Sequence, residues 1–283
     1  MNSLRWMLTV LIALTSSSAI PAMAQARCND SNRVGQGGGL VVFGLTTDQL
    51  LMKFRECNPS KLQRVGFVVG FEAPDTTLVG IDFRAQGGKL YGVGNGGGIY
   101  TIDHDTAVAT KVSQLTVSLN GTNFGVDFNP AADRLRIISD TGQNLRHNVN
   151  AGGVTVADSA LNYTAGVTAP GLTGAAYTNN DLDPTTGTTL FDIDASLNQV
   201  VIQSPPNAGS LAPTGQLTVD VDAPVGFDIY TTQQNGVAIH NDAFASLIVG
   251  GTSGFYRVNL LTGQASLIES LNEQLMDIAI PVY

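Results

Sequence analysis

Short apolar segments of four to six residues recur along the chain, separated by polar turns rich in Gly, Asp, Asn and Pro. Residues 89–93, 99–102 and 134–138 are examples, and β-branched and aromatic side chains are common in them. Runs of this length between turn residues are typical of β-strands and are too short for stable helices. The pattern therefore predicts an all-β protein.

Four of these segments begin alike, with an apolar or small residue, a glycine and two further residues before an aromatic or apolar side chain. The glycines are 45, 49 and 52 residues apart, at Gly80, Gly125, Gly174 and Gly226. Repeats of this length, built from strands and turns, indicate a β-propeller in which each repeat forms one four-stranded blade. A weaker fifth copy, residues 276–280, has Asp277 in place of the glycine.

The two ends of the repeat array are incomplete in complementary ways. Residues 40–69 contain three expected strands with no opening strand before them, and residues 276–282 contain an opening strand with nothing after it. We expect the C-terminal strand to close the ring against the N-terminal sheet, which removes exposed edges and gives five blades. The third repeat has a long turn at 179–187 and a Pro-rich stretch at 204–209, so six blades are the alternative.

The N-terminus has the three parts of a secretory signal. Arg5 precedes an apolar stretch that is too short to span a bilayer, and small residues end the segment at Ala24. We expect cleavage after Ala24 and a secreted or periplasmic protein. No later apolar run approaches spanning length, so we expect no membrane insertion after cleavage. The expected divisions are a signal peptide at 1–24, an N-terminal extension at 25–39 and a single propeller domain at 40–283.

The chain has two cysteines, Cys28 and Cys57. Two thiols in an oxidising compartment usually pair, so we expect a disulfide bond between them. Such a bond would fix the N-terminal extension to the first strands. A reactive thiol or a metal ligand is the alternative.

Composition narrows the class of protein further. With 23 acidic and 14 basic residues, the formal net charge is -9, which disfavours nucleic acid and anionic membranes as partners. The acids are 19 Asp and only 4 Glu, and Gly is 32. Asp and Gly favour turns over helices. A hydrophobic content of 43% argues against disorder.

Residues 124–146 resemble the family called domain of unknown function 4394, which occurs in exported bacterial proteins. The similarity continues through residues 174–180, 190–194 and 203–207 and spans about 40–282. This resemblance implies an extracellular, propeller-like domain. It transfers no catalytic residue.

A carboxylate recurs in the opening strands, at Asp82, Asp127 and Asp228, whereas Ala176 and Ala279 occupy the matching positions of the other repeats. Opening strands line the central channel of a propeller, so the three carboxylates are a candidate site for a hard cation such as Ca²⁺. The alternative is structural: each carboxylate accepts a hydrogen bond from a backbone N–H of the neighbouring blade.

Basic and polar residues also gather in the second repeat. They form a candidate anion- or sugar-binding patch on one rim, with a network that holds adjacent blades together as the alternative. The candidate ligand-binding residues are Arg134, Arg136, Asp140, Asn144 and Arg146.

The chain contains no recognisable set of catalytic motifs, and its three histidines lie in different repeats without metal-ligand spacing. We therefore expect a non-catalytic binding or scaffold module for an extracellular ligand or protein. The alternative is a propeller hydrolase acting at the central channel. It would be a Ca²⁺-dependent, lactonase-like enzyme using Asp82, Asp127 and Asp228, or a glycosidase-like enzyme using paired carboxylic acids.

Overall fold

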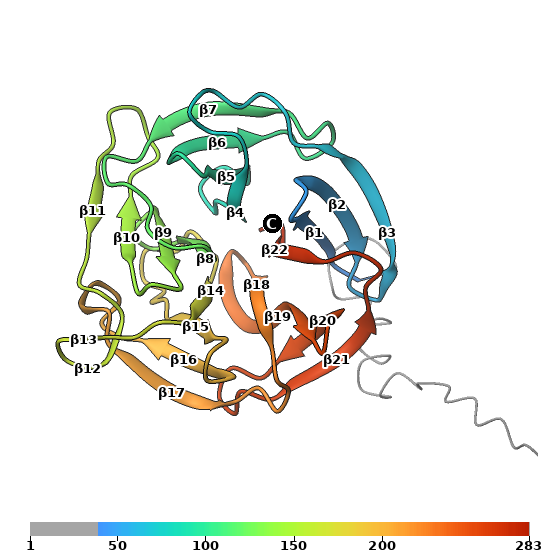
Figure 1. Cartoon of the computed structure of the whole chain (residues 1–283), viewed down its shortest axis with the longest axis vertical. Helices are drawn as coiled ribbons and strands as arrows, with labels where there is room; N and C mark the ends of the chain where they lie inside the picture. Colours follow the sequence, from blue (N-terminus) through green and yellow to red (C-terminus); the bar gives the residue numbers. More distant parts are fainter. Residues whose placement is uncertain (1–38, 283) are drawn as a thin grey trace, which may run out of the picture.

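A computed structural model describes residues 39–282, and these residues form five four-stranded antiparallel sheets around a central axis (Figure 1). The sheets are the blades of a β-propeller, which confirms the all-β, five-bladed prediction. The expected signal peptide at 1–24 and Cys28 lie outside the described residues, so cleavage and the Cys28–Cys57 disulfide stay predictions. Within 39–282, no helix is both long enough and apolar enough to span a membrane.

The strands of each blade are given from the innermost to the outermost. Blade 1 contains β22 (Leu275–Ala279), β1 (Val41–Thr46), β2 (Leu50–Arg55) and β3 (Asn58–Phe67). Blade 2 contains β4 (Leu78–Phe83), β5 (Leu90–Gly94), β6 (Gly98–Ile102) and β7 (Ala109–Gln114). Blade 3 contains β8 (Phe124–Asn129), β9 (Arg134–Ser139), β10 (Asn144–His147) and β11 (Thr155–Ala157).

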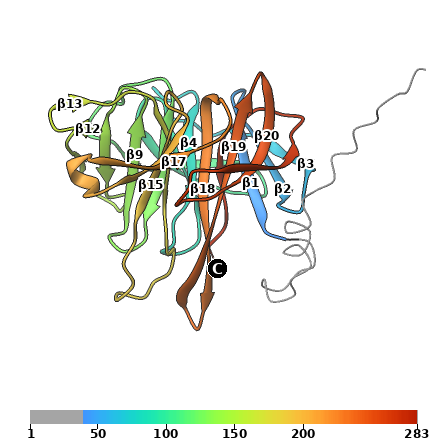
Figure 2. The same cartoon turned by 90° about the horizontal axis from the view of Figure 1, so that it is seen from below.

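The remaining blades follow the same order. Blade 4 contains β14 (Leu172–Tyr177), β15 (Leu190–Asp194), β16 (Gln199–Gln203) and β17 (Leu211–Gln216). Blade 5 contains β18 (Asp222–Gln234), β19 (Val237–Val249), β20 (Thr252–Val258) and β21 (Ala265–Ser270). The hairpin between β18 and β19 projects beyond one face of the ring (Figure 2).

Blade 1 is built from both ends of the chain, as the incomplete repeats predict. β22 pairs antiparallel with β1, with Phe43 opposite Ala279 and Gly44 opposite Ile278. In Figure 1 the described C-terminus lies near the centre of the ring. The C-terminal strand therefore closes the circle and leaves β1 without an unpaired edge.

Described residues 39–282 form no sixth blade. The extra strand pair is a small hairpin, β12 (Asn162–Thr164) with β13 (Val167–Thr168), and it lies between blades 3 and 4 rather than within the third repeat. The Pro-rich stretch contains only the 3-10 turn η1 (Pro206–Ala208), and the long turn between β14 and β15 stays a loop.

The hydrophobic core is divided among the five blade interfaces. One cluster of buried side chains lies at each interface; between blades 2 and 3, for example, Tyr91 packs edge-on against Phe128 with ring centroids 5.1 Å apart. Innermost strands such as β4 are buried on both faces, whereas outermost strands such as β7 are buried on one. This is why the inner strands read as continuous apolar runs while outer strands alternate.

The repeated glycines allow the inner strands to approach one another closely. A Cβ atom on Gly125 would lie 2.7 Å from the backbone nitrogen of Ala175 in the next blade, and one on Gly226 would lie 2.8 Å from the Cα of Asp277. A side chain at either position would collide with backbone, which explains why these two strands carry glycine.

Candidate functional site

The aspartates of the inner strands connect adjacent blades. Each carboxylate accepts a hydrogen bond from a backbone N–H of the next inner strand around the ring, which is the structural role expected as the alternative to metal binding. The pairs are Phe128 N to Asp82 Oδ2 (2.7 Å), Tyr177 N to Asp127 Oδ1 (3.0 Å) and Ile280 N to Asp228 Oδ2 (2.6 Å).

Asp277 makes the same connection between blades 1 and 2, accepting a bond from Ile81 N at 2.7 Å. The glycine-based alignment treats Asp277 as a substituted glycine and so misses this role. An alignment on the aspartate and the residue after it would have found Asp277, because each of the four connecting aspartates precedes Phe or Ile. Blade 4 has Ala176 instead, and there Asn180 Nδ2 donates to the carbonyl of Ile229 in blade 5 at 3.0 Å.

Asp82, Asp127 and Asp228 also converge. Each offers an oxygen within 4.8 Å of the others, and each is at most 5% exposed. Burial raises the pKa of all three, that of Asp228 to about 7, and the charge of neighbouring carboxylates raises the pKa of Asp82 and Asp127 further. Such a cluster needs protons or a cation to compensate its charge.

The donor chemistry of this cluster fits a hard cation such as Ca²⁺, which prefers oxygen ligands. However, five of the six carboxylate oxygens already accept a backbone N–H. Asp127 Oδ2 is the exception. The arrangement therefore serves first to hold the blades together, and a cation would have to share these oxygens.

Arg136 is the centre of the second candidate cluster. It projects from β9 with its side chain buried, and its guanidinium donates to Asp158 Oδ2 (2.7 Å) and Asn144 Oδ1 (2.7 Å) within the same repeat. It also donates to Asn207 Oδ1 (2.8 Å) and the hydroxyl of Tyr177 (3.3 Å) in blade 4. These bonds connect blades 3 and 4, as the structural alternative for this cluster proposes.

The other members of that cluster divide into two groups. Arg146 joins the network by donating to Asp158 Oδ1 at 3.0 Å. Arg134 instead bonds to backbone carbonyls of its own turn, and Asp140 accepts backbone N–H groups of the loop before β8. Asp158, which the sequence pattern did not single out, is the carboxylate that the two network arginines share.

Blade 4 carries a buried carboxylate beside this network. Both oxygens of Asp192 lack a hydrogen-bond partner among the described residues, as does Oε1 of Gln203. Burial raises the pKa of Asp192 well above its ordinary value, although the nearby charge of Arg136 opposes that shift. Burial therefore favours the neutral, protonated form of Asp192.

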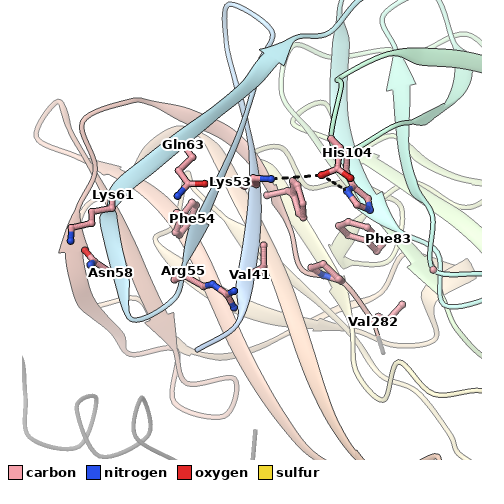
Figure 3. Close-up of a pocket in the computed structure, with 14 residues that line it drawn as sticks. Val41, Lys53, Phe54, Arg55, Asn58, Lys61, Gln63, Phe83, His104 and Val282 are labelled. Carbon is pink, nitrogen blue, oxygen red and sulfur yellow. Dashed lines mark ion pairs between the residues drawn. The ribbon is translucent and has the colours of Figure 1, made fainter. Parts of the chain in front are cut away.

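A cavity of about 690 Å³ lies between blades 1 and 2 (Figure 3). Three rings form an aromatic cluster at its wall, with centroid distances of 5.6 Å for Phe43–Phe83, 5.3 Å for Phe43–His104 and 6.1 Å for Phe83–His104. The other apolar lining residues are Val41, Phe54, Pro281 and Val282, and the polar ones are Lys53, Arg55, Asn58, Lys61, Gln63 and Asp105.

The basic wall of this cavity follows from the two-residue period of β2. Lys53 and Arg55 are two positions apart and so project from the same face, with Phe43 directly opposite Lys53 on β1. Lys53 Nζ lies 3.7 Å from Asp105 Oδ1, and the Arg55 guanidinium donates to the carbonyl of Gly39 at 3.0 Å. No sequence motif marks this site, because its walls come from three separate parts of the chain.

The chain belongs to the family described as domain of unknown function (DUF4394), which matches residues 50–279. This confirms the resemblance seen in the sequence. A search of curated proteins found no match.

Two solved structures are similar to this chain. One is a structural genomics protein of unknown function from Bacteroides thetaiotaomicron VPI-5482, with TM-score 0.48 and 12% identity over 87% of this chain and 65% of that one. The other is an auxiliary nutrient binding protein from Bacteroides ovatus ATCC 8483, with TM-score 0.40 and 13% identity over 79% of this chain and 57% of that one. The chain thus spans less than two thirds of either. At these values neither protein's function transfers to this chain.

Proposed function

We propose that the protein is an exported, non-catalytic binding module and that its ligand enters the cavity between blades 1 and 2. The observation that carries this proposal is the cavity itself. Its volume of about 690 Å³ is in the usual range for small-molecule sites, and it combines apolar and aromatic walls with a few polar groups. The predicted signal peptide supports a ligand met outside the cytoplasm.

The central carboxylates support binding over hydrolysis. A glycosidase needs one carboxylic acid and one carboxylate that reach the scissile bond. Asp82, Asp127 and Asp228 are at most 5% exposed, and nearly all their oxygens are engaged with backbone N–H groups. A substrate would have to displace bonds that hold the ring together.

A blocking variant tests the location of the site. Gln63 lines the cavity from the exposed face of β3, so Gln63→Trp fills the cavity without entering the core. Val112→Trp is the matched control on β7, another outer strand, away from the cavity. The chain starting at residue 25 is titrated calorimetrically with three bicyclic aromatic probes, 2-naphthoate, 2-naphthamide and 2-naphthylmethylammonium.

We expect at least one probe to bind the wild-type chain and Val112→Trp, and to lose its binding in Gln63→Trp. The proposal is wrong if none of the probes binds, or if Gln63→Trp binds them as well as the control does.

A further inference from the structure

We infer that the cavity between blades 1 and 2 selects an amphipathic organic anion: a flat apolar body that carries a single carboxylate or sulfonate. This inference rests on the proposed function and names the class of ligand for the same site. It is argued from the charges, the aromatic surface and the size of the cavity.

Charge is distributed unevenly around the cavity. Two flexible ammonium groups, Lys53 and Lys61, line it together with one carboxylate, Asp105. Lys61 is exposed and pairs with no carboxylate within residues 39–282. The contact between Lys53 and Asp105 is long, and the Asp105 side chain is 72% exposed, so solvent screens it strongly. Both amines are therefore able to turn toward a bound anion.

The three basic lining residues, Lys53, Arg55 and Lys61, form a basic wall that stands out because the chain as a whole has a formal net charge of -9. This wall concentrates positive charge at one place on an acidic protein, and such a local field attracts anions and repels cations. Two compact ammonium groups suit one carboxylate or sulfonate. Bidentate recognition of a polyphosphate favours several arginines, and the single lining arginine, Arg55, already donates to the carbonyl of Gly39.

The apolar part of the ligand has an equally defined position. Phe43, Phe83 and His104 contact one another at tilted angles of 47° to 57°, so each ring is fixed by its neighbours. Val41 and Val282 complete this apolar side (Figure 3). A planar apolar body packs well against such a rigid surface, where offset or edge-on ring contacts add to area burial.

The three naphthalene probes test the inference because they share one apolar body and differ in charge. For the wild-type chain we expect 2-naphthoate to bind about tenfold more tightly than 2-naphthamide, equivalent to about 1.4 kcal/mol. We expect 2-naphthylmethylammonium to bind most weakly. Lys53→Ala and Lys61→Ala should each weaken naphthoate binding about three- to tenfold and leave naphthamide binding unchanged. Lys111→Ala on β7, outside the cavity, is the matched control.

The outcomes separate the inference from the proposed function. If naphthamide binds as tightly as naphthoate and Gln63→Trp abolishes both, the site is real and the anion inference is wrong. Preference for the ammonium probe also overturns the inference. If the lysine variants and Lys111→Ala lose the same affinity, the lysines do not recognise the anion, and the inference is wrong. Absence of binding by all three probes overturns both proposals.

Discussion

The inner-strand aspartates differ in how many backbone hydrogen bonds they accept. Asp228 uses both oxygens, one for Ile229 N and one for Ile280 N. Asp127 uses Oδ1 alone, for Tyr177 N. A carboxamide has no charge, one acceptor oxygen and one donor nitrogen. An Asp→Asn substitution therefore removes the negative charge and keeps a single acceptor oxygen.

We expect Asp127→Asn to raise the free energy of unfolding at pH 8 by about 1 kcal/mol. The amide oxygen retains the bond from Tyr177 N, while one negative charge leaves a buried cluster in which each pKa unit corresponds to about 1.4 kcal/mol. Asp228→Asn should lower the free energy of unfolding by about 1–3 kcal/mol, because its amide nitrogen would face a backbone N–H.

Urea denaturation of the two variants beside wild type measures both changes. Equal destabilisation by the two substitutions would contradict the argument, since it would mean that the charge of Asp127 itself is needed.

The close approach of adjacent inner strands gives a second residue-scale prediction. Gly125→Ala should destabilise the protein by about 1–3 kcal/mol, because its Cβ would meet the backbone of blade 4 at 2.7–2.8 Å. Gly187→Ala is the control: it lies in the loop after β14, without atoms within 4 Å of a Cβ, and should change stability little. Thermal melting compares them, and similar melting temperatures would exclude the close-approach explanation.

At the scale of elements, the sequence predicts strands well where apolar runs are short and bounded by turn residues. Residues 40–69 were expected to contain three strands, and the structure has three there: β1 (Val41–Thr46), β2 (Leu50–Arg55) and β3 (Asn58–Phe67). The β12–β13 hairpin was not foreseen. Its segments are two and three residues long and mostly exposed, so they carry no periodic apolar signal.

Sites are harder to predict than strands for a physical reason. The equivalence of Asp82, Asp127 and Asp228 follows from the repeat itself, because equal positions in equal blades meet at one axis. The cavity between blades 1 and 2 has no such symmetry. Lys53, His104 and Val282 come together only once the ring is closed.

Arg136 allows a prediction about the interface between blades 3 and 4. Arg136→Ala removes the donor to Asp158, whose side chain is 4% exposed, and to two amide oxygens. Breaking a buried ion pair on one side costs about 3–5 kcal/mol, and Arg146, which also donates to Asp158, offsets part of that loss. Arg134→Ala, two residues earlier, loses only bonds to its own turn and should change stability by about 0.5 kcal/mol or less.

Denaturation of both arginine variants provides the measurement. A loss for Arg134→Ala as large as that for Arg136→Ala would argue against a special role of the network.

At the scale of the whole molecule, the ring of buried carboxylates makes stability depend on pH. The pKa of Asp228 rises from 3.8 to about 7 on folding, so the folded state binds more protons than the unfolded state between these values. The corresponding stability is complete below about pH 4 and is lost as pH rises through 7. His147 acts in the opposite direction, because burial lowers its pKa from 6.5 to about 4.

We therefore expect the stability difference between wild type and Asp228→Asn to grow as pH falls from 8 to 5. Comparing the two proteins cancels the effect of His147, and chemical denaturation at several pH values measures the difference. A difference independent of pH would refute the proposed protonation of Asp228.

Adding calcium tests whether protons or a metal ion compensate the negative charge of the buried carboxylate cluster. Since five of the six oxygens in the cluster accept backbone N–H groups, we expect millimolar CaCl₂ to leave the melting temperature of the wild-type chain unchanged at pH 8. A rise in melting temperature that Asp127→Asn abolishes would instead assign Asp82, Asp127 and Asp228 to a cation, because a ligand of the folded state stabilises it by mass action.

The composite first blade has a consequence for biosynthesis. β22 (Leu275–Ala279), which covers the inner edge of β1, follows the strands of blades 2 to 5 in the chain and is translated after them. During elongation β1 therefore keeps an unpaired edge until β22 has been made, and no order of events on the ribosome is able to finish the circle sooner. The ring therefore stays open until the strands of all five blades have been translated.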